Sequence, residues 1–212
     1  LAEIVKPQRM QYAITEFVDI AGLVAGASKG EGLGNQFLAN IRETDAIAQV
    51  VRCFSDDNVI HVAGKVDPLS DIEVINTELA LADMETVEKA LARAGKQAKS
   101  GGDKEAALLV ALLEKVRAQL DQCQPVRVMA LDEEDQLRLK PLCLLTIKPT
   151  MYLANVDENG FHDNPLLTSL EELAKREGAP VVAICAKIES EIADLEDADK
   201  TDFLKDMGLE EP

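Results

Sequence analysis

The stretch Phe17–Asn35, FVDIAGLVAGASKGEGLGN, joins a short apolar run to a loop that contains five glycines. Asp19 stands in the apolar run and Gly22 follows three residues later, giving the pattern Asp-x-x-Gly. An aspartate at the carboxyl end of a strand can hold Mg²⁺ through water, and the glycine leaves a backbone N–H for a γ-phosphate. Alone, this tetrapeptide is more often an ordinary turn. The glycine-rich loop behind it favours a nucleotide-sensing switch.

Short β-rich runs elsewhere in the chain predict a parallel sheet. Each is apolar without strict alternation, as expected of strands that are buried on both faces. Predicted helices separate them, so the sequence indicates an α/β fold. The predicted strands are Phe17–Ile20, Gln49–Phe54, Met151–Val156 and Val181–Cys185, and the predicted helices are Asn35–Ala46 and Pro165–Glu177, the second capped by Gly178.

The segment from about residue 72 to 140 departs from this alternation. Two runs of apolar residues step by four and three, which predicts two amphipathic helices with near-heptad seams. The turn Ser100–Asp103 between them indicates an antiparallel hairpin inserted into the α/β domain. We therefore expect three parts: residues 1–71 and 141–212 form the α/β domain, and residues 72–140 form the insertion. The seams are Ala80, Met84, Val87, Leu91, Ala94 and Ala98, then Leu109, Leu113, Val116, Leu120 and Cys123.

Two further motifs follow predicted strands. Asn155–Glu158, NVDE, stands where P-loop GTPases carry Asn-Lys-x-Asp, whose aspartate binds guanine. Here Val156 replaces the lysine and Glu158 replaces the aspartate, so we expect guanine to be read poorly. Cys185–Lys187, CAK, stands where GTPases carry Ser-Ala-Lys, so its backbone would border the base. Either motif alone would be read as a polar turn, but the ordered set at strand ends is far more specific. We expect Asp19, Asn155 and Ala186 to cluster along the carboxyl ends of the strands, where open α/β sheets bind ligands.

At this point the chain closely resembles the YchF/Obg-like ATPase family. The resemblance implies a P-loop NTPase fold of the G-domain type, with a parallel sheet and an inserted helical, partly coiled-coil hairpin. It implies an ATP-hydrolysing switch at the ribosome, in the cytoplasm, with ATP and Mg²⁺ as cofactors. Asp19 would serve the metal, and the nucleotide contacts would be Gly22, Asn155, Val156, Glu158, Cys185, Ala186 and Lys187. The resembling segments are Asp19–Ile47, Val62–Pro68, Thr77–Asp83, Leu145–Pro149 and Ile188–Ile192.

Parts of the family pattern are missing. The sequence contains no GxxxxGK[ST] phosphate-binding loop. The first strand, the switch I region and the C-terminal TGS domain of resembling proteins are also not found. We expect a portion of a longer protein that does not hydrolyse ATP alone. Two alternatives stay open: a GTP-binding protein, and a nucleotide-free helical interaction module.

His61 is the candidate catalytic residue. Many GTPases place a glutamine after Asp-x-x-Gly to orient the attacking water. Here that position is Leu23, which cannot hold a water. His61 follows the second predicted strand, and its neutral imidazole could orient or deprotonate water. The alternative is an ordinary surface histidine, as we read His162.

Charge is unevenly distributed along the chain. The net charge is −17, which disfavours DNA binding. A basic stripe on one predicted helix face, Lys89, Arg93, Lys96 and Lys99, is the candidate contact for ribosomal RNA, against the alternative of a solvated face. No apolar run is long enough to cross a membrane. The four cysteines, Cys53, Cys123, Cys143 and Cys185, form no zinc-binding spacing and are expected to be reduced core thiols of a cytosolic protein.

Overall fold

The computed structural model describes residues 13–20, 33–56, 58–59, 64–101, 104–193 and 195. Its strands are β1 (Ile47–Arg52), β2 (Thr150–Asn155) and β3 (Val181–Ile184). Its α-helices are α2 (Leu33–Glu43), α3 (Pro68–Gly101), α4 (Lys104–Asp121), α5 (Glu133–Leu139), α6 (Pro165–Glu177) and α7 (Ala186–Ala193). Short 3-10 helices, Val126–Val128 and Lys140–Leu142, flank α5. None of these helices combines the length and apolar composition that a membrane crossing requires.

The three strands form one parallel sheet in the order β1-β2-β3. Ile47 of β1 pairs with Thr150 of β2, and Tyr152 of β2 pairs with Val181 of β3. Because the strands are parallel, their carboxyl ends lie along one edge of the sheet. The predicted α/β class with a parallel sheet is therefore confirmed, with strand bounds shifted by two residues or fewer.

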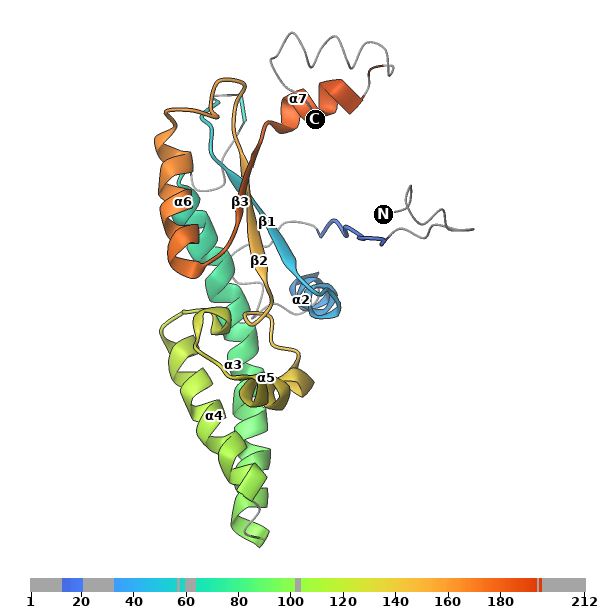
Figure 1. Ribbon diagram of the computed structural model, residues 1–212, viewed down its shortest axis with the longest axis vertical. Helices are drawn as coiled ribbons and strands as arrows, with labels where there is room; N and C mark the ends of the chain where they lie inside the picture. Colours follow the sequence, from blue (N-terminus) through green and yellow to red (C-terminus); the bar gives the residue numbers. More distant parts are fainter. Residues whose placement is uncertain are drawn as a thin grey trace, which may run out of the picture.

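One face of the sheet packs against α6 and the beginning of α3 (Figure 1). The cluster at this face contains buried side chains from β1, β2, α3 and α6: Val51, Tyr152, Ala154, Ile72, Leu167, Leu170 and Ala174. Helix α6 spans Pro165–Glu177, the predicted bounds, and ends at Gly178, whose φ of 68° provides the predicted left-handed cap. This packing fixes the loops at both ends of α6.

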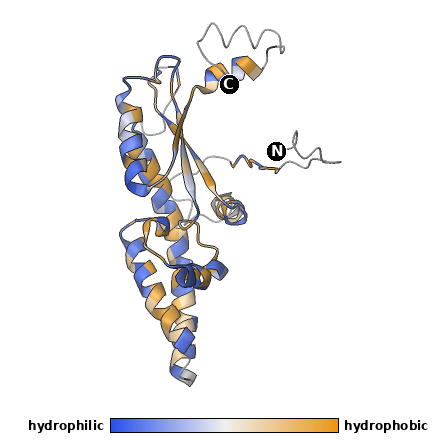
Figure 2. Cartoon of the chain, viewed as in Figure 1, coloured by the Kyte–Doolittle hydropathy of each residue, from blue (hydrophilic) through white to orange (hydrophobic). Residues whose placement is uncertain are grey.

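Helices α3 and α4 form the predicted antiparallel hairpin, which projects away from the sheet (Figure 1). Figure 2 shows hydrophobic and hydrophilic residues interspersed along both helices, as expected for helices with one buried face. Most of the predicted seam residues pack together in one apolar cluster between the two helices. This cluster also contains Leu112, which was not predicted as a seam residue. Since α3 begins at Pro68 and packs on the sheet through Ile72, the division into parts at residue 72 stays a prediction. The buried seam residues are Ala80, Val87, Ala94, Leu113, Val116 and Leu120.

A buried carboxylate attaches the hairpin to the sheet. Asp83 of α3 is 0% exposed and accepts hydrogen bonds from the Leu145 and Thr146 backbone N–H groups, each at 2.8 Å. The Thr146 hydroxyl donates a third bond at 2.7 Å. Burial raises the pKa of Asp83, and these hydrogen bonds, with the charge of Arg42, oppose that rise. The segment before β2 is thereby fixed to the middle of α3.

Two sequence predictions about parts of the chain outside the candidate site are wrong. Phe17–Ile20 forms no strand, and Phe17 and Val18 are 80% and 57% exposed. An extended segment needs a neighbouring strand to satisfy its backbone, and residues 13–20 pair with none of the described strands. Cys123 and Cys143 are exposed rather than buried, whereas Cys53 and Cys185 are buried thiols as expected.

Replacing Asp83 with alanine should loosen the attachment of the hairpin. The substitution leaves two buried N–H groups without an acceptor, at a cost of about 1–3 kcal/mol each. In the full-length protein, we expect hydrogen exchange of the Leu145 and Thr146 amides to accelerate at least ~10-fold. Asp121→Ala, an exposed change at the end of α4, is the control. Unchanged protection of both amides would show that Asp83 does not hold this segment.

Candidate functional site

Asn155 and Ala186 meet at the carboxyl edge of the sheet. Asn155 is the last residue of β2, and Ala186 is the first residue of α7, directly after β3 and Cys185. The Ala186 backbone N–H donates to the Asn155 side-chain oxygen at 3.0 Å. The parallel pairing of β2 with β3 places the two loops side by side. The structure therefore brings together two motifs that lie about 30 residues apart in sequence.

Glu158 and Lys187 form an ion pair across the same two loops. Lys187 Nζ lies 2.6 Å from Glu158 Oε1, and the side chains are 69% and 48% exposed. The hydrogen bond and charge of Glu158 raise the pKa of Lys187, and the charge of Glu191 adds to this. The lysine is therefore protonated at neutral pH. The sequence placed both residues near a base but gave no indication of this pairing.

Val156 does not occupy the position expected from its motif. Its side chain is 2% exposed and packs in the core beneath the sheet edge. Its side chain therefore cannot contact a bound base, which corrects the expectation that Val156 is one of the nucleotide contacts. Cys185 is 3% exposed, so only its backbone could border a ligand.

The loop after β2 is held by Asn164, which belongs to none of the sequence motifs. Asn164 caps α6 by accepting from the Leu166 N–H at 3.0 Å. Its side-chain amide donates to the carbonyls of Cys53 at 2.9 Å and Gly160 at 3.0 Å. Asn164 thus joins the end of β1 to the loop that carries Glu158. The Asn-Pro pair at the start of α6 is a helix-start signal that could have identified it.

The remaining predicted site residues are not part of this cluster. Asp19 lies in residues 13–20, and its neighbour Ile20 packs against the same apolar cluster as Ile47, the first residue of β1. The expected grouping of Asp19 with Asn155 is therefore not seen. Gly22 and His61 lie outside the described residues. Among the residues that are described, no group of three or more His, Cys, Asp or Glu side chains could hold a metal ion.

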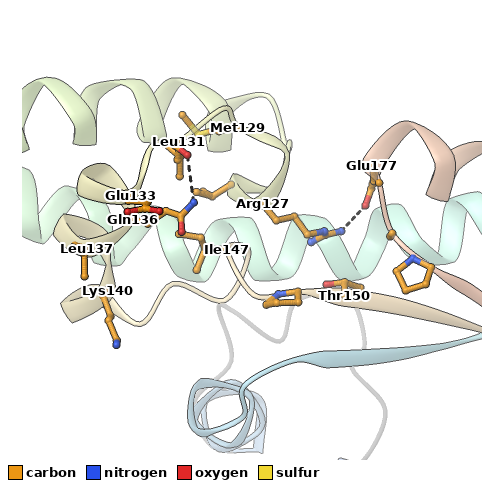
Figure 3. Close-up of a pocket in the computed structure, with 15 residues that line it drawn as sticks. Arg127, Met129, Leu131, Glu133, Gln136, Leu137, Lys140, Ile147, Thr150 and Glu177 are labelled. Atoms are coloured by element: carbon orange, nitrogen blue, oxygen red, sulfur yellow. Dashed lines mark hydrogen bonds and ion pairs between the residues drawn. The ribbon is translucent and has the colours of Figure 1, made fainter.

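A cavity of about 780 Å³ lies at the opposite end of the sheet, beside the base of the hairpin (Figure 3). Arg127 donates to Glu177 at 2.7 Å in its wall, and the Tyr152 hydroxyl donates to Glu177 at 2.9 Å. Burial, with the charge of Glu177, raises the pKa of Tyr152 to about 12. Because Thr150 and Pro180 line this cavity, it is at the amino ends of β2 and β3. It is therefore separate from the cluster of Asn155, Glu158, Ala186 and Lys187.

Comparison with known proteins shows which family the chain belongs to. No family model matches the chain. A Haemophilus influenzae protein described as a ribosome-binding ATPase YchF is 59% identical over 212 residues, covering 100% of this chain and 58% of that protein. The chain belongs to the YchF family. A Bacillus subtilis YchF of the same description is 50% identical over 214 residues, also covering 100% of this chain and 58% of the relative.

A solved structure supports the same YchF assignment. The Schizosaccharomyces pombe YchF GTPase matches with a TM-score of 0.81 and 33% identity. The match covers 99% of this chain and 58% of that one. The chain thus spans about 58% of the length of the YchF relatives it matches.

Gly160→Ala should disturb the loop that carries Glu158. A methyl group at this position would lie 2.8 Å from Asp157 Oδ1, 3.1 Å from Val156 Cβ and 3.2 Å from Asn164 Nδ2. The Asp157 side chain must shift, and the crowding against Val156 and Asn164 should cost about 1–3 kcal/mol. Gly95→Ala is the matched control: nothing lies within 4 Å of the new methyl in the interior of α3, and alanine should stabilise the helix by about 0.5–1 kcal/mol. Thermal denaturation of the full-length variants should give shifts of opposite sign. Equal shifts would contradict the crowding at Gly160.

Proposed function

We propose that the full-length protein containing this chain is a nucleotide-dependent switch that binds and hydrolyses ATP and acts at the ribosome in the cytoplasm. The observation that carries the proposal is the meeting of Asn155, Glu158, Ala186 and Lys187 at the carboxyl edge of the sheet. Open α/β sheets bind ligands at this edge. The curated relatives are described as ribosome-binding ATPases.

The described residues account for base recognition rather than for phosphate chemistry. The polar groups of exposed Glu158 and Lys187 and of half-buried Asn155 can hydrogen-bond to the edge of a purine. Hydrolysis requires the phosphate-binding loop, which this sequence lacks. Asp19 and Gly22 are our candidates for the Mg²⁺ and γ-phosphate contacts, and His61 is our candidate for orienting the attacking water, all on the strength of the sequence.

A GTP-binding protein is the second candidate, favoured by one finding. The similar S. pombe structure is described as a GTPase. Against it stands the Asn-x-x-Glu motif: the glutamate is longer than the aspartate that reads guanine in GTPases, and Val156 is buried where those proteins carry lysine. A nucleotide-free interaction module would use the hairpin alone and bind neither nucleotide.

The full-length protein should bind ATP more tightly than GTP. Isothermal titration with each nucleotide and Mg²⁺ measures the two dissociation constants directly. Binding of GTP ten times tighter than ATP, a difference of about 1.4 kcal/mol, would favour the GTPase reading. If neither ATP nor GTP binds, the result would favour the nucleotide-free interaction module. Because the phosphate contacts are common to both nucleotides, the comparison reports on the base.

The basic stripe on α3 is our candidate ribosome contact. Arg93, Lys96 and Lys99 are exposed and make no ion pair with a described residue. Lys89 lies 3.5 Å from Glu85, so part of its charge is already compensated. The stripe lies towards the far end of α3, where the hairpin projects from the sheet (Figure 1). Its position and charge suit the phosphate backbone of ribosomal RNA.

Reversing Lys96 and Lys99 to glutamate should weaken ribosome binding and flatten its salt dependence, because fewer counterions are released on binding. Co-sedimentation of the full-length protein with ribosomes across a salt series measures both effects. Lys175→Glu with Arg176→Glu, exposed changes at the end of α6, alters the net charge equally and is the control. Identical curves for the two double variants would leave the stripe as a solvated helix face.

A further inference from the structure

We propose that Lys187 is a purine-specificity residue: its ion pair with Glu158 occupies one oxygen of the carboxylate that guanine would need, and so favours adenine. The proposal rests on the nucleotide-binding function proposed above and deepens it. It attributes the preference for adenine over guanine to competition between Lys187 and the base for the Glu158 carboxylate, and not to the length of the glutamate alone.

The two purines make different demands on a carboxylate. Guanine presents an N1–H and an N2 amino group side by side and can use both carboxylate oxygens, while its O6 needs a donor. Adenine presents one N6 amino donor at position 6, where guanine has an acceptor. A single free carboxylate oxygen is therefore enough for adenine, whereas guanine must share the second oxygen with any cation already bound to it, which weakens one of its two hydrogen bonds. A site that leaves such polar groups unpaired discriminates against the ligand.

Both groups that guanine would use are already engaged within the chain. Glu158 Oε1 lies 2.6 Å from Lys187 Nζ. The Ala186 N–H, which could donate to O6, instead donates to the Asn155 side-chain oxygen at 3.0 Å. A bound guanine would have to share or displace both contacts.

The pairing is accessible to a ligand and electrostatically reinforced. The two side chains are 48% and 69% exposed, so they can contact a base without a rearrangement of the core. Glu191, one turn further along α7, also favours the protonated lysine. Exposed ion pairs contribute modestly, so the competition should change the relative affinity for the two purines by about two- to fivefold.

The first test is Lys187→Met in the full-length protein. Dissociation constants for ATP and GTP, each with Mg²⁺, are measured by competition against a fluorescent ATP analogue. The readout is the ratio of GTP affinity to ATP affinity, in which changes in ribose and triphosphate binding cancel. We expect the ratio to rise about two- to fivefold. Lys187→Arg, which retains the ion pair, should not raise it, and neither should Lys175→Met, an exposed change on α6.

The second test asks whether the effect passes through Glu158. In a Glu158→Gln background there is no carboxylate to compete for, so adding Lys187→Met should leave the ratio unchanged. In the wild-type protein, raising the KCl concentration should raise the ratio by screening the pair, and it should do so less in Lys187→Met. The salt series needs no variant, so it tests the proposal even if Lys187→Met fails to fold.

The outcomes distinguish failure of the proposed role of Lys187 from failure of the proposed ATP-binding function. An unchanged ratio in folded Lys187→Met, or a change that persists in the Glu158→Gln background, overturns the role of Lys187 while leaving ATP binding intact. Absence of ATP binding by the wild-type protein overturns the proposed function itself.

Discussion

The arrangement of the chain depends on the carboxylate of Asp83, which lies inside the protein with both oxygens occupied. A buried charge is tolerated only where hydrogen bonds replace the lost water. Asp83 receives three, all from Leu145 and Thr146. Because these residues directly precede β2, the contact fixes where the central strand of the sheet begins. It also fixes the hairpin, since Asp83 belongs to α3.

Neighbouring contacts extend this junction to α2. Lys148 donates to the carbonyl of Arg42 at 3.2 Å and also to that of Thr44, at the carboxyl end of the helix, where a cation is favoured. Arg42 in turn donates to the Cys143 carbonyl at 3.1 Å. The end of α2, the middle of α3 and the start of β2 therefore share one short segment, residues 143–148. Asn155 and the loop that carries Glu158 lie at the other end of β2, which this segment positions.

The sequence predicted those features that depend on local patterns. Apolar runs located three strands, the spacing of four and three residues located the hairpin, and Asn155 with Ala186 was placed at one edge because parallel strands end together. Features that depend on distant partners were not predictable. Phe17–Ile20 has strand composition but no neighbour among the described strands, and Val156 carries no mark that distinguishes a core valine from one at a ligand.

The two ion pairs that join distant parts of the chain could not be predicted from the sequence either. Lys187 and Glu158 are 29 residues apart, and Arg127 and Glu177 are 50 residues apart. Charged residues are frequent along the chain, so composition alone could not pair them. These contacts depend on how the folded chain places the loops after β2 and β3, and on how it places Arg127 beside the end of α6.

The insertion of the hairpin between β1 and β2 also bears on the order in which the chain folds. Ile47 pairs with Thr150, about 100 residues later. Closing so long a loop before any contact within it has formed is entropically costly and slow. The α3–α4 pair is local in sequence and buries its own apolar seam, so it can form first and shorten the effective separation between the two strands. We therefore expect helix pairing to precede sheet formation, with the candidate site at the carboxyl ends of the strands among the last parts to assemble.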